Sequence, residues 1–562
     1  MTFPSTTTTP WLPLPLPLHL LLPAALGILA HRAYFIRGEH VLSIPPLLLT
    51  TTLLCTTTIA LRTLIFQLPL LPTAFLITSI AAAFVTGCLA STVIYRVSPS
   101  HRLHGVPGPF AARLSIWYFM WKNVGLQGPS WFEEIHARYG EVVRIGSDTI
   151  SVSDPDIIAA VHSPMSRCGK PIGYLPGWPL TTLQQLRDKT MHNRRRRLGW
   201  DQAFTAKSLR GYESRILKYV SQLEASIRGA GARPIDITER IRWFSFDVMG
   251  DLAFGRSFNG LQSETTHWAI DAIYDSNKTT VVVGCTPWLA HLLTRLPDWL
   301  NPQAALLRFS DASLQARQQL DPEEPDIMSH LLAADAFYAD PKAQQDLMKG
   351  DSRLIIIAGS DTTASTLTFL FYYLASEPQL QRRLRKELAA NNLHDSASIA
   401  VESVQHLPYL DGLVNETLRL HPPVQTSTMR ETPAEGLQVG DRFIPGLVTI
   451  TTPLSTIHRS PKAFRQPNDF IPERWTTRPE LILNKSAFAP FLAGPYGCIG
   501  KQLAMMELRT VAARLVLAFQ ISLAEGEDGS RLLRESEDVF TTHAMPLRLV
   551  FEERKGGTEL HR

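Results

Sequence analysis

The residues best suited to do chemistry lie near the end of the chain, in Phe491–Gly500 (FLAGPYGCIG). Three glycines and a proline surround Cys498 there, and an amphipathic segment runs from Gly500 to about Phe519. At the start of a helix, the positive end of the dipole and nearby amide N–H groups favour the thiolate form of a cysteine. The glycines let the backbone approach a flat cofactor closely. A thiolate held in this way can ligate haem iron.

Cys498 has a second interpretation, as a buried structural residue in a glycine-rich turn. The total number of cysteines is odd, two of them lie in apolar stretches, and no pair has a CxxC spacing; the five are Cys55, Cys88, Cys168, Cys285 and Cys498. A disulfide framework or a structural zinc site is therefore not expected. The main body is expected to be a reduced domain that faces the cytosol.

A second group of polar residues interrupts a long apolar run with a helical pattern, Leu347–Ala375. Gly359 weakens a helix locally, and the hydroxyl of Thr362 can take a hydrogen bond to a backbone carbonyl. Asp361 lies between these two residues. The sequence predicts a local distortion of the helix here, although a polar stop in a buried helix would have the same pattern.

Two charged motifs are ordinary when each is taken alone. Glu416 and Arg419 are three residues apart and share a helical face, where they can pair. Such a pair on the surface contributes little to stability. The basic run Arg194–Arg197 is typical of a solvated helix face.

A mainly helical body is expected to position these residues. Apolar positions three and four apart recur in the stretches 200–227, 235–254, 344–376 and 377–390. Short strands are expected at 142–145, 149–152, 438–439, 448–451 and 544–551. No repeat of fixed period is visible. The sequence predicts a mainly α fold with small peripheral β-sheets.

Composition narrows the class of protein. The chain has 562 residues, of which 45% are hydrophobic and 19% charged, and its formal net charge is only +4. That balance gives no reason to expect a nucleic-acid partner. The length suits a large enzyme domain with an appendage. Nearly all the charge lies beyond the first hundred residues, so the appendage is apolar.

Three apolar runs in that appendage, at about 11–30, 41–61 and 68–95, each approach the roughly 20 residues that a helix needs to cross a bilayer. Prolines in the first run and Pro45-Pro46 in the second fit a regular helix less well. A cleaved signal peptide fits poorly, because no basic segment precedes the first run and the hydrophobicity recurs. Residues 1–97 are therefore predicted to be a membrane anchor, with three transmembrane helices.

The basic residues around these runs indicate the topology. Arg32 and Arg37 lie between the first two runs, Arg96 and Arg102 follow the third, and only Arg62 lies between the second and the third. The positive-inside rule then places the first link and the main body on the cytoplasmic side. The turn formers GVPGP, within 98–112, are predicted to form a stiff hinge, and 113–562 the catalytic domain.

The segment around Cys498 resembles the haem-binding signature of the cytochrome P450 family, Phe-x-x-Gly-x-Arg-x-Cys-x-Gly. Phe491, Gly494, Cys498 and Gly500 match it, whereas Tyr496 stands where the family usually has an Arg or His that reaches a haem propionate. Three more segments match in the family's order, and the resemblance covers roughly 105–551. Details such as the sequence HRSP at 458–461 look most like fungal membrane-bound members. The resemblance implies the cytochrome P450 fold, with Cys498 as the axial ligand of haem iron.

The other matching segments imply roles for further residues. The segment AGSDTT resembles the oxygen-activation motif, which implies that Thr362 and Asp361 relay protons. The sequence ETLR resembles the family's Glu-x-x-Arg helix, and FIPERW resembles the element that supplies a second arginine. By this analogy Glu416, Arg419 and Arg474 form a buried charge network that supports the cofactor loop.

Basic residues are implied at the haem propionates and at a docking face. The sequence HNRRR resembles the family's Trp/His-x-x-x-Arg helix, which implies that His192 and Arg196 lie near the propionates. Arg430 is a third candidate for this role. A positive docking face for an acidic electron donor would contain Arg194, Arg195, Arg197 and Lys501.

The function that the resemblance implies is a monooxygenase containing haem b. It would receive electrons from NADPH through a flavin-containing cytochrome P450 reductase, with cytochrome b5 as a further donor. It would insert one oxygen atom into a lipophilic small molecule, such as a fungal secondary metabolite, at the endoplasmic reticulum membrane. Pocket walls are expected from 168–187, 354–362, 424–428 and 540–543. The alternatives are a haem-thiolate isomerase or dehydratase that needs no reductase, a non-catalytic haem sensor, and a small transporter.

Overall fold

The computed structural model describes residues 18–174, 181–301, 303–320, 322–426 and 428–554. Contacts within the chain divide it into two compact units, Met1–Gly105 and Val106–Arg562. The division falls inside the segment 98–112, where the sequence predicts a hinge. The predicted boundaries of the anchor and the catalytic domain stay predictions.

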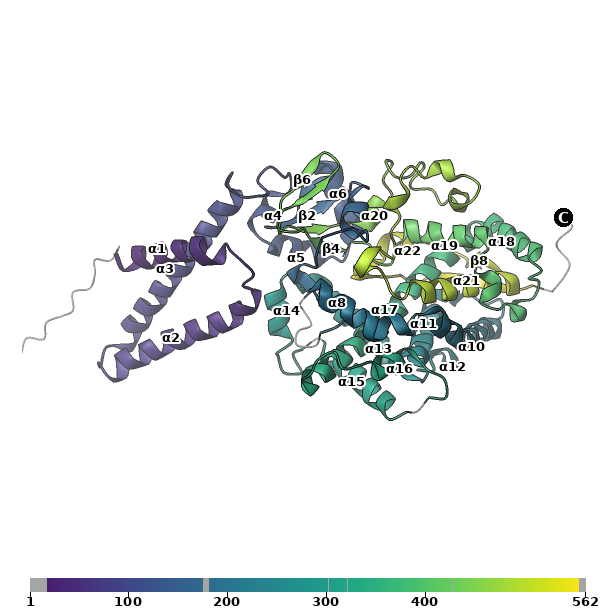
Figure 1. Cartoon of the computed structure of the whole chain (residues 1–562), viewed down its shortest axis with the longest axis horizontal. Coiled ribbons are helices and arrows are strands. Elements are labelled where there is room, and N and C mark those ends of the chain that lie inside the picture. The colour runs from purple at the N-terminus through teal and green to yellow at the C-terminus, as the bar shows by residue number, and fades with distance from the viewer. Residues whose placement is uncertain (1–17, 175–180, 302, 321, 427, 555–562) are drawn as a thin grey trace, which may run out of the picture. The chain divides into compact units, whose positions relative to one another are not determined.

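The first unit consists of helices that are long and apolar enough to cross a membrane. They are α1 (Leu18–Ala30) with the π-helical turn η1 (His31–Phe35), α2 (Ile44–Leu64), which follows the short turn η2 (Val41–Ser43), and α3 (Leu70–Val97). Part of the first predicted run, 11–17, lies outside the described residues. Arg62 belongs to the last turn of α2 and not to the link that follows it. Figure 1 labels α1, α2 and α3 in the purple part of the chain. Their length and hydropathy fit a membrane association.

Helices α1 and α3 pack closely because each carries a glycine where the other approaches. A Cβ atom on Gly27 would lie 2.1 Å from the Phe84 carbonyl oxygen, and one on Gly87 would lie 2.0 Å from that of Ala24. Small residues at such contacts are typical of helix pairs in membranes. A hydrogen bond of 2.8 Å between His31 Nδ1 and Ser91 Oγ joins the same two helical segments.

The second unit is mainly helical, as the sequence predicts. Its longer helices are α6 (Gly128–Tyr139), α10 (Ala206–Ala230), α11 (Ile237–Phe254), α13 (Trp268–Val283), α15 (Ala304–Gln318), α17 (Pro341–Ser376), α18 (Pro378–Ala390), α19 (Pro408–Leu420) and α21 (Lys501–Ala518). Its shorter helices are α4 (Phe110–Leu114), α5 (Trp117–Asn123), α7 (Ile157–His162), α8 (Lys189–Arg195), η4 (Arg196–Trp200), α9 (Asp201–Ala203), α12 (Gly260–Ser263), α14 (Pro287–Leu293), α16 (Ile327–Ala333), α20 (Leu454–Ile457), η7 (Pro472–Trp475) and α22 (Ser530–Glu535).

Small sheets complete this unit. The largest has the strand order β1-β2-β7-β4, formed by β1 (Val142–Arg144), β2 (Thr149–Val152), β7 (Thr449–Thr451) and β4 (Met429–Glu431). The others pair β3 (Ile235–Asp236) and β8 (Phe519–Leu523) with β11 (Arg548–Glu553), β9 (Glu537–Val539) with β10 (Thr541–His543), and β5 (Leu437–Val439) with β6 (Arg442–Ile444). β2 and β7 run parallel, so a strand from early in the unit lies beside one from late in it.

Helix α17 forms the centre of the core. Asp340 caps it by accepting a hydrogen bond of 3.0 Å from the Ala343 amide, and Pro341 occupies its first turn. By length and hydropathy α17 could also span a membrane, but 67% of its most apolar window is buried inside the unit. Its apolar surface therefore packs against other helices, α11 above all.

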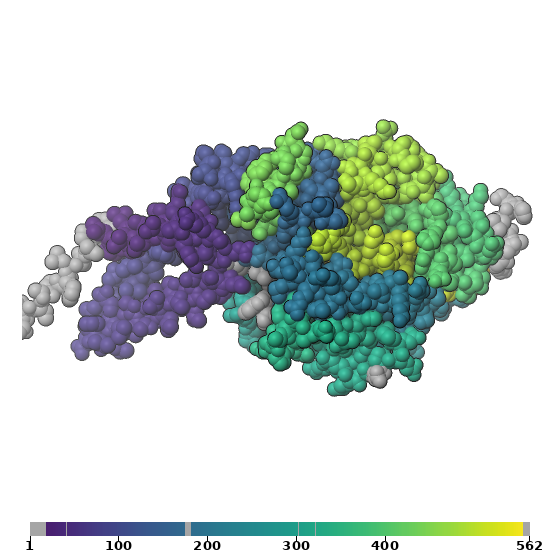
Figure 2. Space-filling model, in the orientation of Figure 1, coloured from purple at the N-terminus to yellow at the C-terminus, as the bar shows by residue number. Residues whose placement is uncertain are grey.

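Segments far apart in the sequence meet around this core. On the face shown in Figure 2, the blue segments α8 to α10 border the yellow C-terminal part on one side and the green segment of α15 and α16 on the other. The contact of α10 with α21, and of η4 with α16, agrees with that view. The loop that precedes α21 is thus brought beside residues from the α8 region.

Candidate functional site

The loop around Cys498 is shaped by glycine and by backbone hydrogen bonds. Gly494 has a φ of +68°, and a Cβ there would lie 2.5 Å from the Ser163 carbonyl oxygen, so only glycine fits. The Cys498 amide donates to the Phe491 carbonyl at 2.8 Å. Gly500 is the N-cap residue of α21. Cys498 is therefore held just before the start of a helix, as the sequence predicts.

The thiol of Cys498 lines an internal space. The residue is exposed, yet burial raises the pKa of its thiol, so its exposure does not place it on the outer surface. The amide N–H groups of Gly500 and Lys501 and the positive charge of Arg196 act in the opposite direction and lower that pKa. The loop thus desolvates the thiol and also supplies donors that favour a negatively charged sulfur.

One turn in the middle of α17 also borders an internal space. Ala358 is exposed and Thr362 is half-buried, although both lie on the central helix of the core. The Thr362 hydroxyl donates to the Ala358 carbonyl at 2.8 Å, as predicted. The helix nevertheless runs without a break, so the predicted distortion does not interrupt it. Gly359 has a different role, because a Cβ there would lie 2.5 Å from Met249 on α11.

Asp361 is held by neutral donors at long distance. Its Oδ2 lies 3.4 Å from Asn277 Nδ2 on α13 and 3.4 Å from Thr541 Oγ1 on β10. Burial raises the pKa of Asp361 to about 6, and the positive charge of Arg242 opposes that shift. A carboxyl group with this pKa can take up and release protons near neutral pH.

Glu416, Arg419 and Arg474 meet in one buried network, as the resemblance implies. Arg419 donates to Glu416 from Nη2 and Nε at 2.7 and 2.9 Å, and Arg474 Nε lies 3.2 Å from Glu416 Oε1. All three side chains have 0% exposure. Trp475 Nε1 donates to Glu416 Oε2 at 2.9 Å, a partner that the sequence did not suggest. The remaining guanidinium donors bond backbone carbonyls between 458 and 481, so the network ties α19 to the segment before the Cys498 loop.

His192 and Arg196 reach the same loop from α8 and η4. His192 Nε2 lies 3.1 Å from the Pro495 carbonyl oxygen, and Arg196 Nη1 donates to that oxygen at 3.0 Å. Arg196 also pairs with Asp201 at 3.0 Å. Burial, followed by the charge of Lys170, lowers the pKa of His192 to about 4, which makes this imidazole neutral.

Arg430 and Lys170 both lie close to the aromatic ring of Tyr496. The Arg430 guanidinium carbon is 4.9 Å from the centre of the Tyr496 ring, and Lys170 Nζ is 4.7 Å from it. His192 packs edge-on against the same ring at 4.8 Å. Arg430 Nε and the Tyr496 hydroxyl are both buried, and neither has a hydrogen-bond partner among the described residues.

Comparison with known proteins identifies the family. A family model described as Cytochrome P450 matches residues 107–551. The chain belongs to the cytochrome P450 family. Its mainly helical architecture with small sheets is accordingly the cytochrome P450 fold, and the chain is a monooxygenase of that family.

Several curated cytochromes P450 are similar over most of their length. The monooxygenase notG' of Aspergillus versicolor is 39% identical over 519 residues, which cover 92% of this chain and 94% of that protein. Tryprostatin B 6-hydroxylase of Aspergillus fumigatus is 35% identical over 93% of this chain and 94% of its own. The monooxygenase orf5 of Eupenicillium brefeldianum is 37% identical over 86% and 97%.

The residues present fit the haem that a cytochrome P450 carries. Cys498 offers a sulfur ligand at the start of α21, facing an internal space. Haem also brings two carboxylates, and the cluster around Tyr496 offers buried donors that have no partner among the residues the structure describes. These donors are Arg430 Nε and the Tyr496 hydroxyl, close to the candidates His192 and Arg196.

Arg195 does not belong to the docking face that the sequence suggested. Its side chain is fully buried and pairs with Asp351 on α17 at 2.7 Å. A buried cation needs such a partner, and the Trp200 indole also donates to Asp351, at 3.1 Å. Arg194, Arg197 and Lys501 are exposed, so only these three residues of the predicted face remain candidates.

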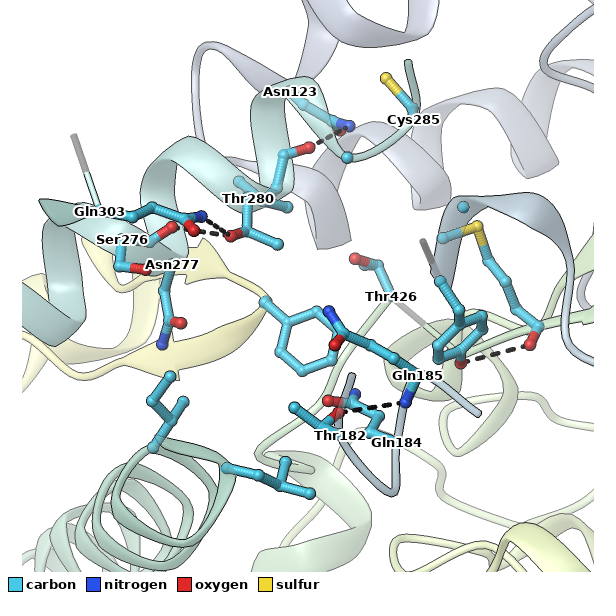
Figure 3. A pocket seen from close by; sticks show the side chains of 18 of the residues that line it. Asn123, Thr182, Gln184, Gln185, Ser276, Asn277, Thr280, Cys285, Gln303 and Thr426 are labelled. Atoms are coloured by element: carbon cyan, nitrogen blue, oxygen red, sulfur yellow. Dashed lines mark hydrogen bonds between the residues drawn. The ribbon is translucent and has the colours of Figure 1, made fainter. Parts of the chain in front are cut away.

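A cavity of about 160 Å³ borders α13 and α17. Each of the four predicted wall segments contributes lining residues, among them Tyr174, Leu354, Thr426 and Phe540. Sequence reasoning missed the contribution of α13, whose polar residues look like an ordinary solvated face. Figure 3 shows amide side chains placed around this cavity from several elements, namely Asn123, Gln184, Gln185, Asn277 and Gln303. Arg353 is the one lining residue with a formal charge among those described.

Proposed function

We propose that this cytochrome P450 inserts one oxygen atom from dioxygen into a neutral, lipophilic small molecule, with electrons from NADPH delivered by a flavoprotein reductase. The observation that carries the proposal is the Cys498 thiol, which lies in the interior at the start of α21 and receives the amide donors of Gly500 and Lys501. Haem, when bound through this sulfur, supplies the iron that activates dioxygen. The thiolate's role is to hold the iron and to raise its electron density.

Asp361 and Thr362 handle protons in this proposal. The Asp361 carboxyl is held by Asn277 and Thr541, and its pKa of about 6 allows it to exchange protons at neutral pH. The Thr362 hydroxyl, next in the chain, is fixed by the Ala358 carbonyl and borders the internal space. An acid and a hydroxyl held in fixed positions can together pass protons from the α13 side to the internal space.

Replacement of Thr362 by alanine is expected to uncouple electron use from product formation. NADPH consumption should continue while product per NADPH falls, by roughly tenfold or more, because proton delivery by a positioned group contributes on this scale or above it. Thr368→Ala is the matched control, since Thr368 makes the same bond to the carbonyl four residues earlier but is fully buried. Equal coupling in both variants would contradict the proton role of Thr362.

Apart from the buried Arg353, the described lining of the cavity is uncharged, which supports a substrate with a few hydrogen-bonding groups and no charge. Five amide side chains and several hydroxyls stand among apolar residues there (Figure 3). Polar groups placed in a mostly apolar pocket fix the orientation of a ligand. One relative is named for the hydroxylation of tryprostatin B. We therefore propose a secondary metabolite of this general character as the substrate.

A spectral titration of the purified haem protein tests that substrate class. Tryprostatin B, and separately a set of neutral compounds with amide groups, are expected to shift the haem absorption spectrum when they bind. A hydrocarbon of equal size should bind more weakly, because the amide donors of the pocket would stay unpaired. Tighter binding of the hydrocarbon, or of a charged compound, would rule the proposed class out.

We propose that the first unit is a three-span anchor in the endoplasmic reticulum membrane, with the catalytic domain in the cytosol. The exposed residues Arg194, Arg197 and Lys501 suit an acidic donor such as the reductase or cytochrome b5.

A haem-thiolate isomerase or dehydratase would turn over without NADPH, and a haem sensor would show no turnover. A requirement for NADPH therefore separates these alternatives.

A further inference from the structure

The cytochrome P450 signature has a cation two residues before its cysteine, and this chain has Tyr496 there instead. Tyrosine offers a hydroxyl donor but no positive charge at neutral pH. The hydroxyl of Tyr496 is buried and has no partner among the described residues. A haem propionate at this position would therefore lack one charge that the family's arginine supplies.

A lysine from a distant segment lies at this position. The chain forms an isolated antiparallel bridge between Gly169 and Glu431, with both backbone hydrogen bonds at 2.9 Å. This bridge sets Lys170 beside Arg430 on β4. Lys170 Nζ then lies 4.7 Å from the centre of the Tyr496 ring, on a side chain that is nearly inaccessible to solvent.

In the part of the chain that the structure describes, no carboxylate pairs with this lysine. Its ammonium group contacts the carbonyl oxygens of Leu183 and Gln184, at 3.2 and 2.6 Å, and His192 Nδ1, at 3.1 Å. Arg430 Nη1 donates to the Tyr174 hydroxyl and the Met429 carbonyl oxygen, and among the described residues its Nε has no hydrogen-bond partner. Burial and the charges of Arg430 and Arg196 lower the pKa of Lys170 to about 6. An anion placed beside Lys170 would oppose this shift, because a nearby opposite charge favours the charged form of an amine.

We propose that Lys170 and Tyr496 together replace the missing arginine at a haem propionate. Lys170 supplies the positive charge, and Tyr496 supplies the hydrogen-bond donor. One arginine side chain would provide both properties. Lys170 is thus a cofactor-positioning residue of this chain, and the inference rests on haem binding at Cys498.

Haem release from the purified full-length holoprotein to excess apomyoglobin tests the pair. Lys170→Met is expected to release haem roughly tenfold to hundredfold faster, the effect of losing one charged hydrogen bond. Lys170→Arg should release it at close to the wild-type rate. Lys189→Met is the matched control, because Lys189 is exposed at the start of α8, and it should have no effect.

The decisive variant combines Lys170→Met with Tyr496→Arg. It restores the positive charge of the cluster at the family's position, so slow haem release should return. The reduction potential of the haem should become more negative in Lys170→Met, because a nearby cation favours the reduced haem. It should return to the wild-type value in the double variant. A lysine with a purely structural role would not be rescued from position 496.

Two outcomes would overturn the inference. One is wild-type haem release from Lys170→Met, and the other is a double variant that loses haem as fast as the single one. If Lys170→Met does not accumulate, Tyr496→Phe tests the hydroxyl alone, and release at the wild-type rate from it would also contradict the pair. A wild-type protein without haem would instead reject the proposed function, so the two failures are distinguishable.

Discussion

Replacement of Cys498 by serine is expected to abolish the carbon-monoxide difference band of a thiolate-ligated haem and to reduce monooxygenase turnover to background. The sulfur of Cys498 is assisted by the amide groups of Gly500 and Lys501 and by the charge of Arg196, all of which favour a negative ligand. A serine hydroxyl in the same place stays protonated at neutral pH, and so it cannot give the iron comparable electron density. Absorption spectra of the reduced protein with carbon monoxide provide the measurement.

The control for this prediction is Cys55→Ser, which removes a thiol from α2 in the first unit. Its spectrum and turnover should equal those of the wild type. Haem content is measured in parallel, so that loss of the band can be separated from loss of the cofactor. A Cys498→Ser protein that kept the band would show that another residue ligates the iron.

Replacement of Glu416 by glutamine is expected to prevent accumulation of folded, haem-containing protein. Glu416 accepts hydrogen bonds from Arg419, Arg474 and Trp475, and within the described ranges no other carboxylate is within ion-pair distance of the two arginines. Removal of its charge would leave both guanidinium groups buried and uncompensated. Such a change costs about 3–5 kcal/mol, a large share of the about 5–15 kcal/mol by which a folded domain is stable.

Glu473→Gln is the matched control for this prediction. Glu473 pairs with Arg383 in the same region, but that arginine is 57% exposed, so the variant should lose less than about 1 kcal/mol. Yield, haem content and thermal unfolding of both variants are compared. A Glu416→Gln protein with wild-type stability would contradict a supporting role for the network.

The sequence by itself determined the features that depend on neighbours along the chain. The position of Cys498 at the start of a helix follows from glycines and an amphipathic pattern that are contiguous with it. The pairing of Glu416 with Arg419 follows from a spacing of one helical turn. The long apolar run of α17 and the apolar helices of the first unit follow from periodicity and length. In each case the decisive partner lies within one element.

Tertiary structure decided which charges are buried and what they meet. Arg195 and Arg194 are neighbours in one basic run, yet Arg195 is buried against Asp351 while Arg194 is exposed. Lys170 reaches Tyr496 only because a backbone bridge sets it beside β4. The amides of α13 line a cavity because the opposite wall comes from other segments. The electrostatic effect of a charge depends on its desolvation and on its partners, and the chain brings both from distant positions only when it folds.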